Sequence, residues 1–87
     1  MIQKEYRLNN LLGLHARPAS LLVQVASEGK SEVTLIKKEK EYNAKSILGV
    51  LSLGAQKGDD LLVRIDGLDE VEIERKIQAL FAGNFRE

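Results

Sequence analysis

Two segments of this 87-residue chain carry apolar side chains at helical spacing, and each segment is apolar on one side only. The first covers residues 16–27 and the second covers residues 69–83. Four shorter segments alternate between apolar and polar side chains, which is the period of a half-buried strand. One-sided helices must cover an apolar surface, so the pattern predicts an antiparallel sheet with helices on one face and water on the other.

The predicted strands span residues 2–8, 32–38, 41–44 and 61–66. A short helix follows Ser46, and with the two long helices the order becomes βαββαβα, which defines an α+β chain. In the first strand, Ile2, Tyr6 and Leu8 are predicted to face inward, with Lys4 as the exception on that face. The second and third strands are close enough in sequence to form a hairpin.

The ends of the helices are marked by individual residues. Proline is tolerated only in the first helical turn, so Pro18 places the start of the first helix within a residue or two of His15. Gly29 is predicted to end that helix in the left-handed conformation. Asp69 and Glu72 have the spacing of a capping box, which predicts that they cap the last helix at its start.

The composition excludes several classes of function. Thirteen basic and thirteen acidic residues balance, so no overall positive field is available to hold nucleic acid or anionic lipid. The chain has no cysteine and only one histidine, so it can form neither a disulfide nor the usual zinc site. No segment has the apolar length of a signal peptide or membrane span. We therefore expect one cytoplasmic domain over residues 1–87, with no metal or other cofactor.

His15 is the only imidazole, and it lies just before a predicted helix start with Arg17 two residues later. The positive end of the helix dipole disfavours an imidazolium, which keeps the ring neutral and nucleophilic near pH 7. The first-turn N–H groups and the Arg17 guanidinium would receive the oxygens of a phosphoryl group on that ring. Because phosphohistidine is labile, His15 is a candidate to accept a phosphoryl group and pass it on.

Interpretations of His15 without a catalytic role stay open at this point. A lone histidine before a helix can be a cap or an ordinary surface residue. Hydrolysis by a Ser-His-Asp triad is disfavoured, because a core this small can hardly enclose a substrate pocket.

Ser46 is predicted to cap the short helix, which is worth about 1 kcal/mol. It is also a candidate phosphorylation site, where a phosphate would place about two negative charges beside apolar residues. Ile47, Leu48 and Leu51 lie on the arc of this helix opposite its core-facing residues, so they form a candidate partner-binding patch. The alternative is that a loop or the first helix covers them.

Residues 13–19 and 45–54 resemble the HPr family, the histidine-containing phosphocarriers of the bacterial sugar phosphotransferase system. The resemblance extends over essentially the whole chain. It implies an open-faced β-sandwich, in which four antiparallel strands in the order one-four-two-three carry three helices on one face. It also implies a carrier that is a substrate of other enzymes and not itself an enzyme.

The resemblance further implies the roles of single residues. His15 would accept phosphate from enzyme I, which draws it from phosphoenolpyruvate, and would donate it to sugar-specific enzyme IIA domains. Arg17 would stabilise the phosphoryl group and Pro18 would shape the start of the helix. Ser20 and Gln24 would lie at the edge of a docking surface centred on Ile47, Leu48 and Leu51. We expect a monomer that binds neither nucleic acid by itself nor a membrane.

For Ser46, the resemblance implies phosphorylation by HPr kinase/phosphorylase and joint action with catabolite control protein A. A second hypothesis is therefore a regulatory module of the same fold that acts mainly through Ser46. A third is a generic small binding domain. Leu12 departs from the family pattern, because many relatives carry there a small polar residue able to hydrogen-bond near the imidazole. Leu48 and Leu51 stand where methionine is common in the Gram-positive type.

Overall fold

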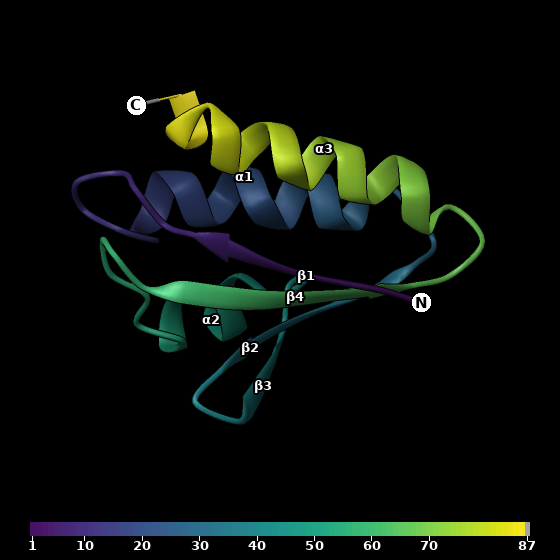
Figure 1. Cartoon of the computed structure of the whole chain (residues 1–87), viewed down its shortest axis with the longest axis horizontal. Coiled ribbons are helices and arrows are strands. Elements are labelled where there is room, and N and C mark those ends of the chain that lie inside the picture. Colours follow the sequence, from purple (N-terminus) through teal and green to yellow (C-terminus); the bar gives the residue numbers. More distant parts are fainter. Residues whose placement is uncertain (87) are drawn as a thin grey trace.

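A four-stranded antiparallel sheet in the order β1-β4-β2-β3 forms the base of the molecule. The computed structural model describes residues 1–86 (Figure 1). Its elements are β1 (Ile2–Arg7), α1 (Ala16–Ser27), β2 (Glu32–Lys37), β3 (Lys40–Asn43), α2 (Ile47–Ser52), β4 (Asp60–Asp66), α3 (Glu70–Ala82) and the 3-10 turn η1 (Asn84–Arg86). The predicted order and α+β class are confirmed, and each predicted strand boundary is within one residue of the observed one.

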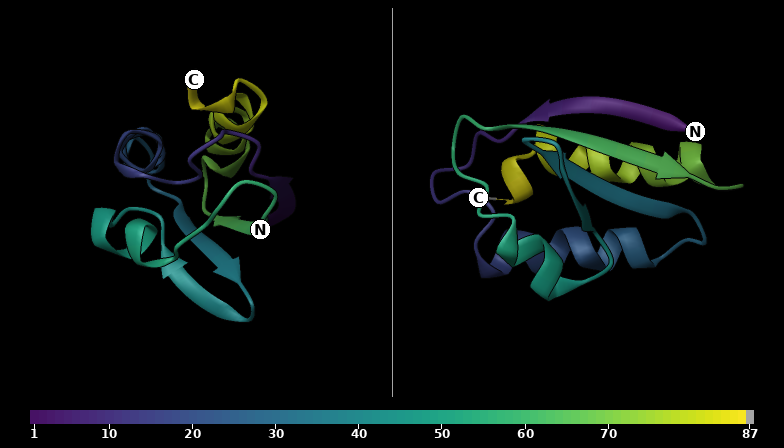
Figure 2. Two further views of the ribbon diagram at one scale, coloured as in Figure 1. Left: turned by 90° about the vertical axis from the view of Figure 1, so that its left-hand side faces the viewer. Right: turned by 90° about the horizontal axis from the view of Figure 1, so that it is seen from below.

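The alternation along the strands sorts their side chains onto two faces. Leu61, Val63 and Ile65 of β4 are buried on the inner face, in keeping with the alternation over residues 61–66. The outer face carries polar residues and ion pairs, among them Arg7 with Asp60. All three helices lie on the inner side, so the sheet is covered on one face only (Figure 2). The resulting architecture is the predicted open-faced sandwich.

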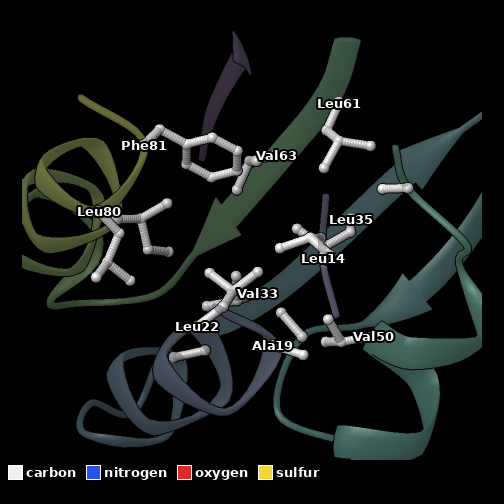
Figure 3. Close-up of a cluster of buried hydrophobic side chains, with 14 of the residues drawn as sticks. Leu14, Ala19, Leu22, Val33, Leu35, Val50, Leu61, Val63, Leu80 and Phe81 are labelled. Atoms are coloured by element: carbon white, nitrogen blue, oxygen red, sulfur yellow. The ribbon is translucent and has the colours of Figure 1, made fainter. Parts of the chain in front are cut away.

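The core fills the space between the sheet and the helices (Figure 3). Ala19 and Leu22 of α1 are fully buried, and Phe81 of α3 is almost completely buried. Val50, from the short helix α2, is also fully buried. Each helix therefore contributes one apolar side, as its sequence pattern predicts.

Lys4 faces the helices for a specific reason. Its ammonium group lies 3.2 Å from a carboxylate oxygen of Glu74, a buried residue of α3. The hydroxyl of Tyr6 donates a hydrogen bond to the other carboxylate oxygen of Glu74. These two donors lower the pKa of Glu74, with the Tyr6 hydrogen bond as the larger cause. Lys4, the exception in the β1 pattern, thus pairs with the buried carboxylate of Glu74. Such a partner is needed because burying an unpaired charge is costly.

The predicted left-handed ending of α1 at Gly29 is wrong. Gly29 does not have a positive φ, and Glu28 is the C-cap, with its N–H donating to the carbonyl oxygen of Val25. A Cβ on Gly29 would lie 2.4 Å from a carboxylate oxygen of Asp69. The position therefore needs glycine because α3 approaches closely, not because the backbone is left-handed.

The predicted capping box at the start of α3 is also wrong. Asp69 occupies the N-cap position, but its side chain makes no cap hydrogen bond. Its carboxylate instead accepts hydrogen bonds from the N–H groups of Lys30 and Ser31, at 2.8 and 3.0 Å, and from the Ser31 hydroxyl. The residue that reaches back is Glu70, which accepts a hydrogen bond from the Gly67 N–H at 3.2 Å. Asp69 therefore accepts hydrogen bonds from residues just before β2 and not from the first turn of α3.

The C-terminal turn η1 contributes to the core, although no motif marks it in the sequence. Phe85 is buried, and its ring lies 4.9 Å from that of Phe81 in an edge-to-face arrangement. Phe81 in turn stacks on Tyr6 with the ring centroids 4.8 Å apart. Three aromatic rings therefore connect β1, α3 and η1. Within residues 1–86, no helix has the length and apolar character needed to cross a bilayer.

Candidate functional site

His15 is the N-cap residue of α1 and is half-buried. Its backbone is extended, with φ −79° and ψ −171°, and its carbonyl oxygen accepts the first helical hydrogen bond from the Ala19 N–H at 2.9 Å. The first three N–H positions of a helix have no intrahelical partner. Because Pro18 is the third of them, the N–H groups that face outward there are those of Ala16 and Arg17. The predicted helix start is confirmed.

Hydrogen bonds to the backbone hold the loop before His15 in place. The Asn10 side-chain amide donates to the Gly13 carbonyl oxygen at 2.6 Å, and the Gly13 N–H donates to the Asn10 carbonyl oxygen at 3.1 Å. The Leu14 N–H donates to the carbonyl oxygen of Ala55 at 3.1 Å. Gly13 has φ +68°, and a Cβ there would lie only 2.4 Å from that Ala55 oxygen. Both the turn and the close contact therefore need glycine.

Residues 55–59, to which this loop is hydrogen-bonded, are themselves anchored to the sheet. Asp59 forms an ion pair with Lys37 of β2 at 2.8 Å and accepts a hydrogen bond from the Gln56 N–H at 2.8 Å. The Lys37 hydrogen bond is the main cause that lowers the pKa of Asp59, followed by the Gln56 N–H. The Leu8 N–H, at the end of β1, also donates to the Asp59 carbonyl oxygen. The sheet therefore holds residues 55–59 in place, and these residues in turn hold the loop that precedes His15.

The other α1 residues singled out from the sequence divide between surface and core. Arg17, Ser20 and Gln24 are all exposed. Their spacing of three and four residues places them along one side of the helix, leading away from His15. Pro18 is fully buried, so the residue that fixes the helix start also packs against the core. Among residues 1–86, no ion pair engages the Arg17 guanidinium.

Ser46 caps α2, as predicted. Its hydroxyl oxygen accepts a hydrogen bond from the Gly49 N–H at 3.1 Å, and its carbonyl oxygen accepts one from the Val50 N–H at 3.0 Å. Ser46 is half-buried. A Cβ on Gly49 would lie 3.0 Å from the Asn43 carbonyl oxygen, so the turn of helix next to Ser46 fits closely against the end of β3.

The apolar patch on α2 is exposed. Ile47, Leu48 and Leu51 have exposed fractions between 38% and 77%, whereas Val50 is fully buried. The alternative that a loop or α1 covers these three side chains is therefore wrong. The start of α1, the loop before it and α2 lie at the same end of the molecule (Figure 2). The fold brings a histidine and an apolar surface to one end, a suitable arrangement for chemistry completed by a partner protein.

Sequence reasoning missed the residues that position His15, chiefly Asn10, Ala55 and Asp59. Gly13 was recognisable as a turn glycine, but its neighbour Ala55 is separated from it by 42 positions in the numbering. Among the described residues, no group of three or more His, Asp or Glu side chains is placed to hold a metal ion.

Fold and site together define a class of small α+β protein that presents one histidine at the start of a helix, beside an exposed apolar helix. Residues 2–83 match the family described as "PTS HPr component phosphorylation site". A phosphocarrier protein HPr from Xylella fastidiosa (strain Temecula1) is 45% identical over 87 residues, covering 100% of this chain and 98% of the relative. The chain therefore belongs to the HPr family of the phosphotransferase system, whose members are phosphocarriers and not catalysts.

Solved structures agree with this assignment. An HPr from Thermoanaerobacter tengcongensis superposes with a TM-score of 0.96 at 39% identity, covering 100% of this chain and 98% of that one. Crh from Bacillus subtilis, described as a catabolite repression protein that forms a swapped dimer, has a TM-score of 0.68 at 36% identity. That comparison covers 99% of this chain and 94% of Crh.

Proposed function

We propose that His15 is the residue that carries the phosphoryl group, accepting it from enzyme I and donating it to sugar-specific enzyme IIA domains. The observation that supports this most directly is the position of His15 as the N-cap of α1. A ring nitrogen, Nδ1 by resemblance to the family, attacks phosphorus as the bond from phosphorus to the donor breaks. The reverse exchange with an acceptor restores the free imidazole, so the carrier is unchanged over one cycle.

Arg17 and Pro18 support this chemistry in different ways. The N–H groups of Ala16 and Arg17 point out of the helix start, where they can donate to phosphoryl oxygens. The exposed Arg17 guanidinium adds a positive charge on the same turn and can move to the phosphoryl group once it is formed. Pro18 contributes by fixing where the helix begins, and therefore which N–H groups are available.

Docking would use the apolar patch of α2 together with the exposed side of α1. Ile47, Leu48 and Leu51 supply apolar area, and Ser20 and Gln24 supply polar contacts at the edge. Leucine is stiffer than the methionine of some relatives, so this patch should be less adaptable to different partners. We expect the carrier to act as a cytoplasmic monomer, without a cofactor of its own.

The test is phosphorylation by enzyme I and phosphoenolpyruvate. Mass spectrometry should show the addition of one phosphoryl group, which acid removes and which is absent in His15→Ala. The matched variant Arg17→Ala should still become phosphorylated but at a rate reduced by about 10-fold or more, since it loses one charged contact to the phosphoryl group. Absence of acid-labile phosphate with an active enzyme I would contradict the carrier role.

We further propose that phosphorylation of Ser46 by HPr kinase/phosphorylase regulates this transfer and permits binding to catabolite control protein A. Ser46 is half-buried and borders the α2 patch. A phosphate there adds about two negative charges beside three exposed apolar side chains, which disfavours an apolar partner. The serine already caps the helix through its oxygen, and a phosphate oxygen can retain that bond to the Gly49 N–H.

The regulatory proposal is tested with Ser46→Asp. The variant should remain folded but accept phosphate at His15 more slowly. Ser52→Asp is the matched control, because Ser52 is an exposed serine at the other end of the same short helix. Equal transfer rates for Ser46→Asp and the wild-type chain would contradict regulation at this position.

The alternative function is a regulatory module that acts mainly through Ser46. The similarity to Crh, which is described as a catabolite repression protein, supports a regulatory role for this fold. The presence of His15 at the helix start favours the carrier, because regulation through Ser46 alone places no chemical demand on an imidazole. Serine phosphorylation in the absence of any transfer through His15 would favour the alternative.

A further inference from the structure

Lys37 is the last residue of β2, and its side chain lies on the inner face of the sheet. The alternation along β2 places Lys37 on the same face as Val33 and Leu35, which are both buried. The Lys37 side chain is only 19% exposed. Lysine is seldom covered to this extent unless its charge is paired. A lysine therefore occupies a position where the strand pattern favours an apolar residue, and its contacts must account for it.

The Lys37 ammonium group contacts residues 54–59, the segment that follows α2, at two points. It lies 2.8 Å from a carboxylate oxygen of Asp59 and donates a hydrogen bond of 3.4 Å to the carbonyl oxygen of Gly54. The same Asp59 oxygen accepts the hydrogen bond from the Gln56 N–H. An ammonium group has three donors, so it can bind both acceptors at once. One cation thus holds both ends of the segment against β2.

This segment connects the two parts of the proposed site. At its start, Gly54 comes directly after the C-cap of α2, the helix that carries the apolar patch. Next to it, the Ala55 carbonyl oxygen accepts the hydrogen bond from the Leu14 N–H, and Leu14 directly precedes His15. The position of the segment therefore determines where the histidine lies relative to the α2 patch.

We propose that Lys37 is a positioning residue for phosphoryl transfer. By holding the segment after α2, its ammonium group keeps His15 at a fixed place relative to the surface on which a partner docks. This inference rests on the proposed function of His15. Transfer requires aligned reacting atoms, and a displacement of about 1 Å can cost roughly 100-fold in rate. Val50 still anchors α2 in the core without Lys37, so loss of the Lys37 charge should slow transfer and leave docking unchanged.

The test measures single-turnover transfer from phosphorylated enzyme I to Lys37→Met by rapid quench, over a range of carrier concentrations. Methionine retains a long apolar side chain but cannot pair with Asp59. The maximal rate should fall by about 10-fold, while the carrier concentration at half-maximal rate stays within about 2-fold of the wild-type value. Lys37→Arg should recover most of the rate, because a guanidinium can still pair with the Asp59 carboxylate.

Amide hydrogen exchange tests the structural link directly. The Leu14 N–H is protected by its hydrogen bond to Ala55, so in folded Lys37→Met it should exchange about 10-fold faster. Lys4→Met is the matched control, because Lys4 is another inward-facing lysine and forms an ion pair with Glu74. This control should lower the Tm but leave the maximal transfer rate and the Leu14 exchange rate at their wild-type values.

The outcomes separate this inference from the proposed function. A wild-type maximal rate in Lys37→Met, or an equal loss of rate in Lys4→Met, would overturn the role of Lys37 and leave the carrier function intact. If Lys37→Met fails to fold, Asp59→Asn tests the same contact. It removes the carboxylate charge while its amide oxygen can still accept from the Gln56 N–H, and it should show the same fall in maximal rate. Absence of acid-labile phosphate on the wild-type chain would contradict the proposed function and this inference with it.

Discussion

The peptide N–H of Leu14 donates a hydrogen bond of 3.1 Å to the carbonyl oxygen of Ala55. This contact joins the loop that precedes His15 to the segment that follows α2. The histidine and the apolar patch of α2 are therefore held by one connected framework. The contact is possible because Gly13, next to Leu14, lets the two backbones approach.

Gly13→Ala should destabilise the protein and displace the His15 loop. The substitution forces an alanine into φ +68° and places its Cβ 2.4 Å from the Ala55 oxygen, so the free energy of unfolding should fall by about 2 to 5 kcal/mol. Gly54→Ala is the control, since Gly54 has φ +66° but nothing within 4 Å of the added Cβ. It should cost only about 1 kcal/mol in urea denaturation. Equal losses would show that backbone strain alone matters at Gly13.

Acid should weaken the contact between Asp69 and the loop before β2. The Ser31 hydroxyl, followed by the Lys30 N–H, holds the pKa of Asp69 below its usual range. The unfolded carboxyl therefore binds a proton first as the pH falls. The stabilisation is complete above about pH 4, the ordinary pKa of aspartate, and is lost as pH falls through the folded-state pKa. Thermal melts between pH 2 and 5 should show a shallower pH dependence for Asp69→Asn.

Two further variants separate Asp69 from the other carboxylates. Ser31→Ala should raise the pKa of Asp69, measured by carbon NMR, because it removes the largest cause of the shift. Glu39→Gln changes an exposed carboxylate in the β2–β3 turn and should leave the acid dependence as it is. An unaltered pH profile in Asp69→Asn would contradict the role assigned to this carboxylate.

Tyr6→Phe should lower stability while keeping the ring stack on Phe81. It removes the hydrogen bond from the Tyr6 hydroxyl to the buried Glu74 carboxylate, at a cost of about 1.5 to 3 kcal/mol. The pKa of Glu74 should rise toward its ordinary value, because that hydrogen bond is the main cause of its depression. Tyr42→Phe should change stability by less than about 0.5 kcal/mol. A similar loss in both variants would indicate a general effect of removing a hydroxyl.

Tyr6→Phe should also change how the stability of the protein depends on pH above about pH 10. Burial, followed by the hydrogen bond to Glu74, raises the pKa of Tyr6. A raised folded-state pKa means that this stabilisation is complete below about pH 10, the ordinary pKa of tyrosine, and is lost as the pH rises above it. Tyr6→Phe should therefore unfold with a weaker dependence on pH above 10, measured by circular dichroism.

Phe85→Ala should destabilise the protein by about 3 to 5 kcal/mol, because a buried aromatic ring leaves a cavity against Phe81. Leu68→Ala is the control, as Leu68 is fully exposed, and should change stability by less than about 0.5 kcal/mol. Urea denaturation measures both. A loss below about 1 kcal/mol for Phe85→Ala would mean that the turn η1 contributes little to folding.

The start of α1, the inward residues of β4 and the Ser46 cap could be predicted from the sequence because each depends on near neighbours. Pro18 acts within its own helical turn, and alternation in β4 repeats every two residues. The exposed arc of α2 follows in the same way from helical geometry. These features place His15 before a helix and predict the candidate patch, although they do not say what lies beside either one.

The partners of Asp69 and Lys4 were decided only by the tertiary structure. The local pattern predicted a capping box for Asp69, but packing brought it to Lys30 and Ser31, 39 and 38 positions away. Lys4 is paired across 70 positions with Glu74. A periodic pattern records which side of an element is apolar, whereas a contact between distant residues depends on how the elements pack. The sequence thus determined the elements and the reactive segment, and packing determined which residues hold that segment in place.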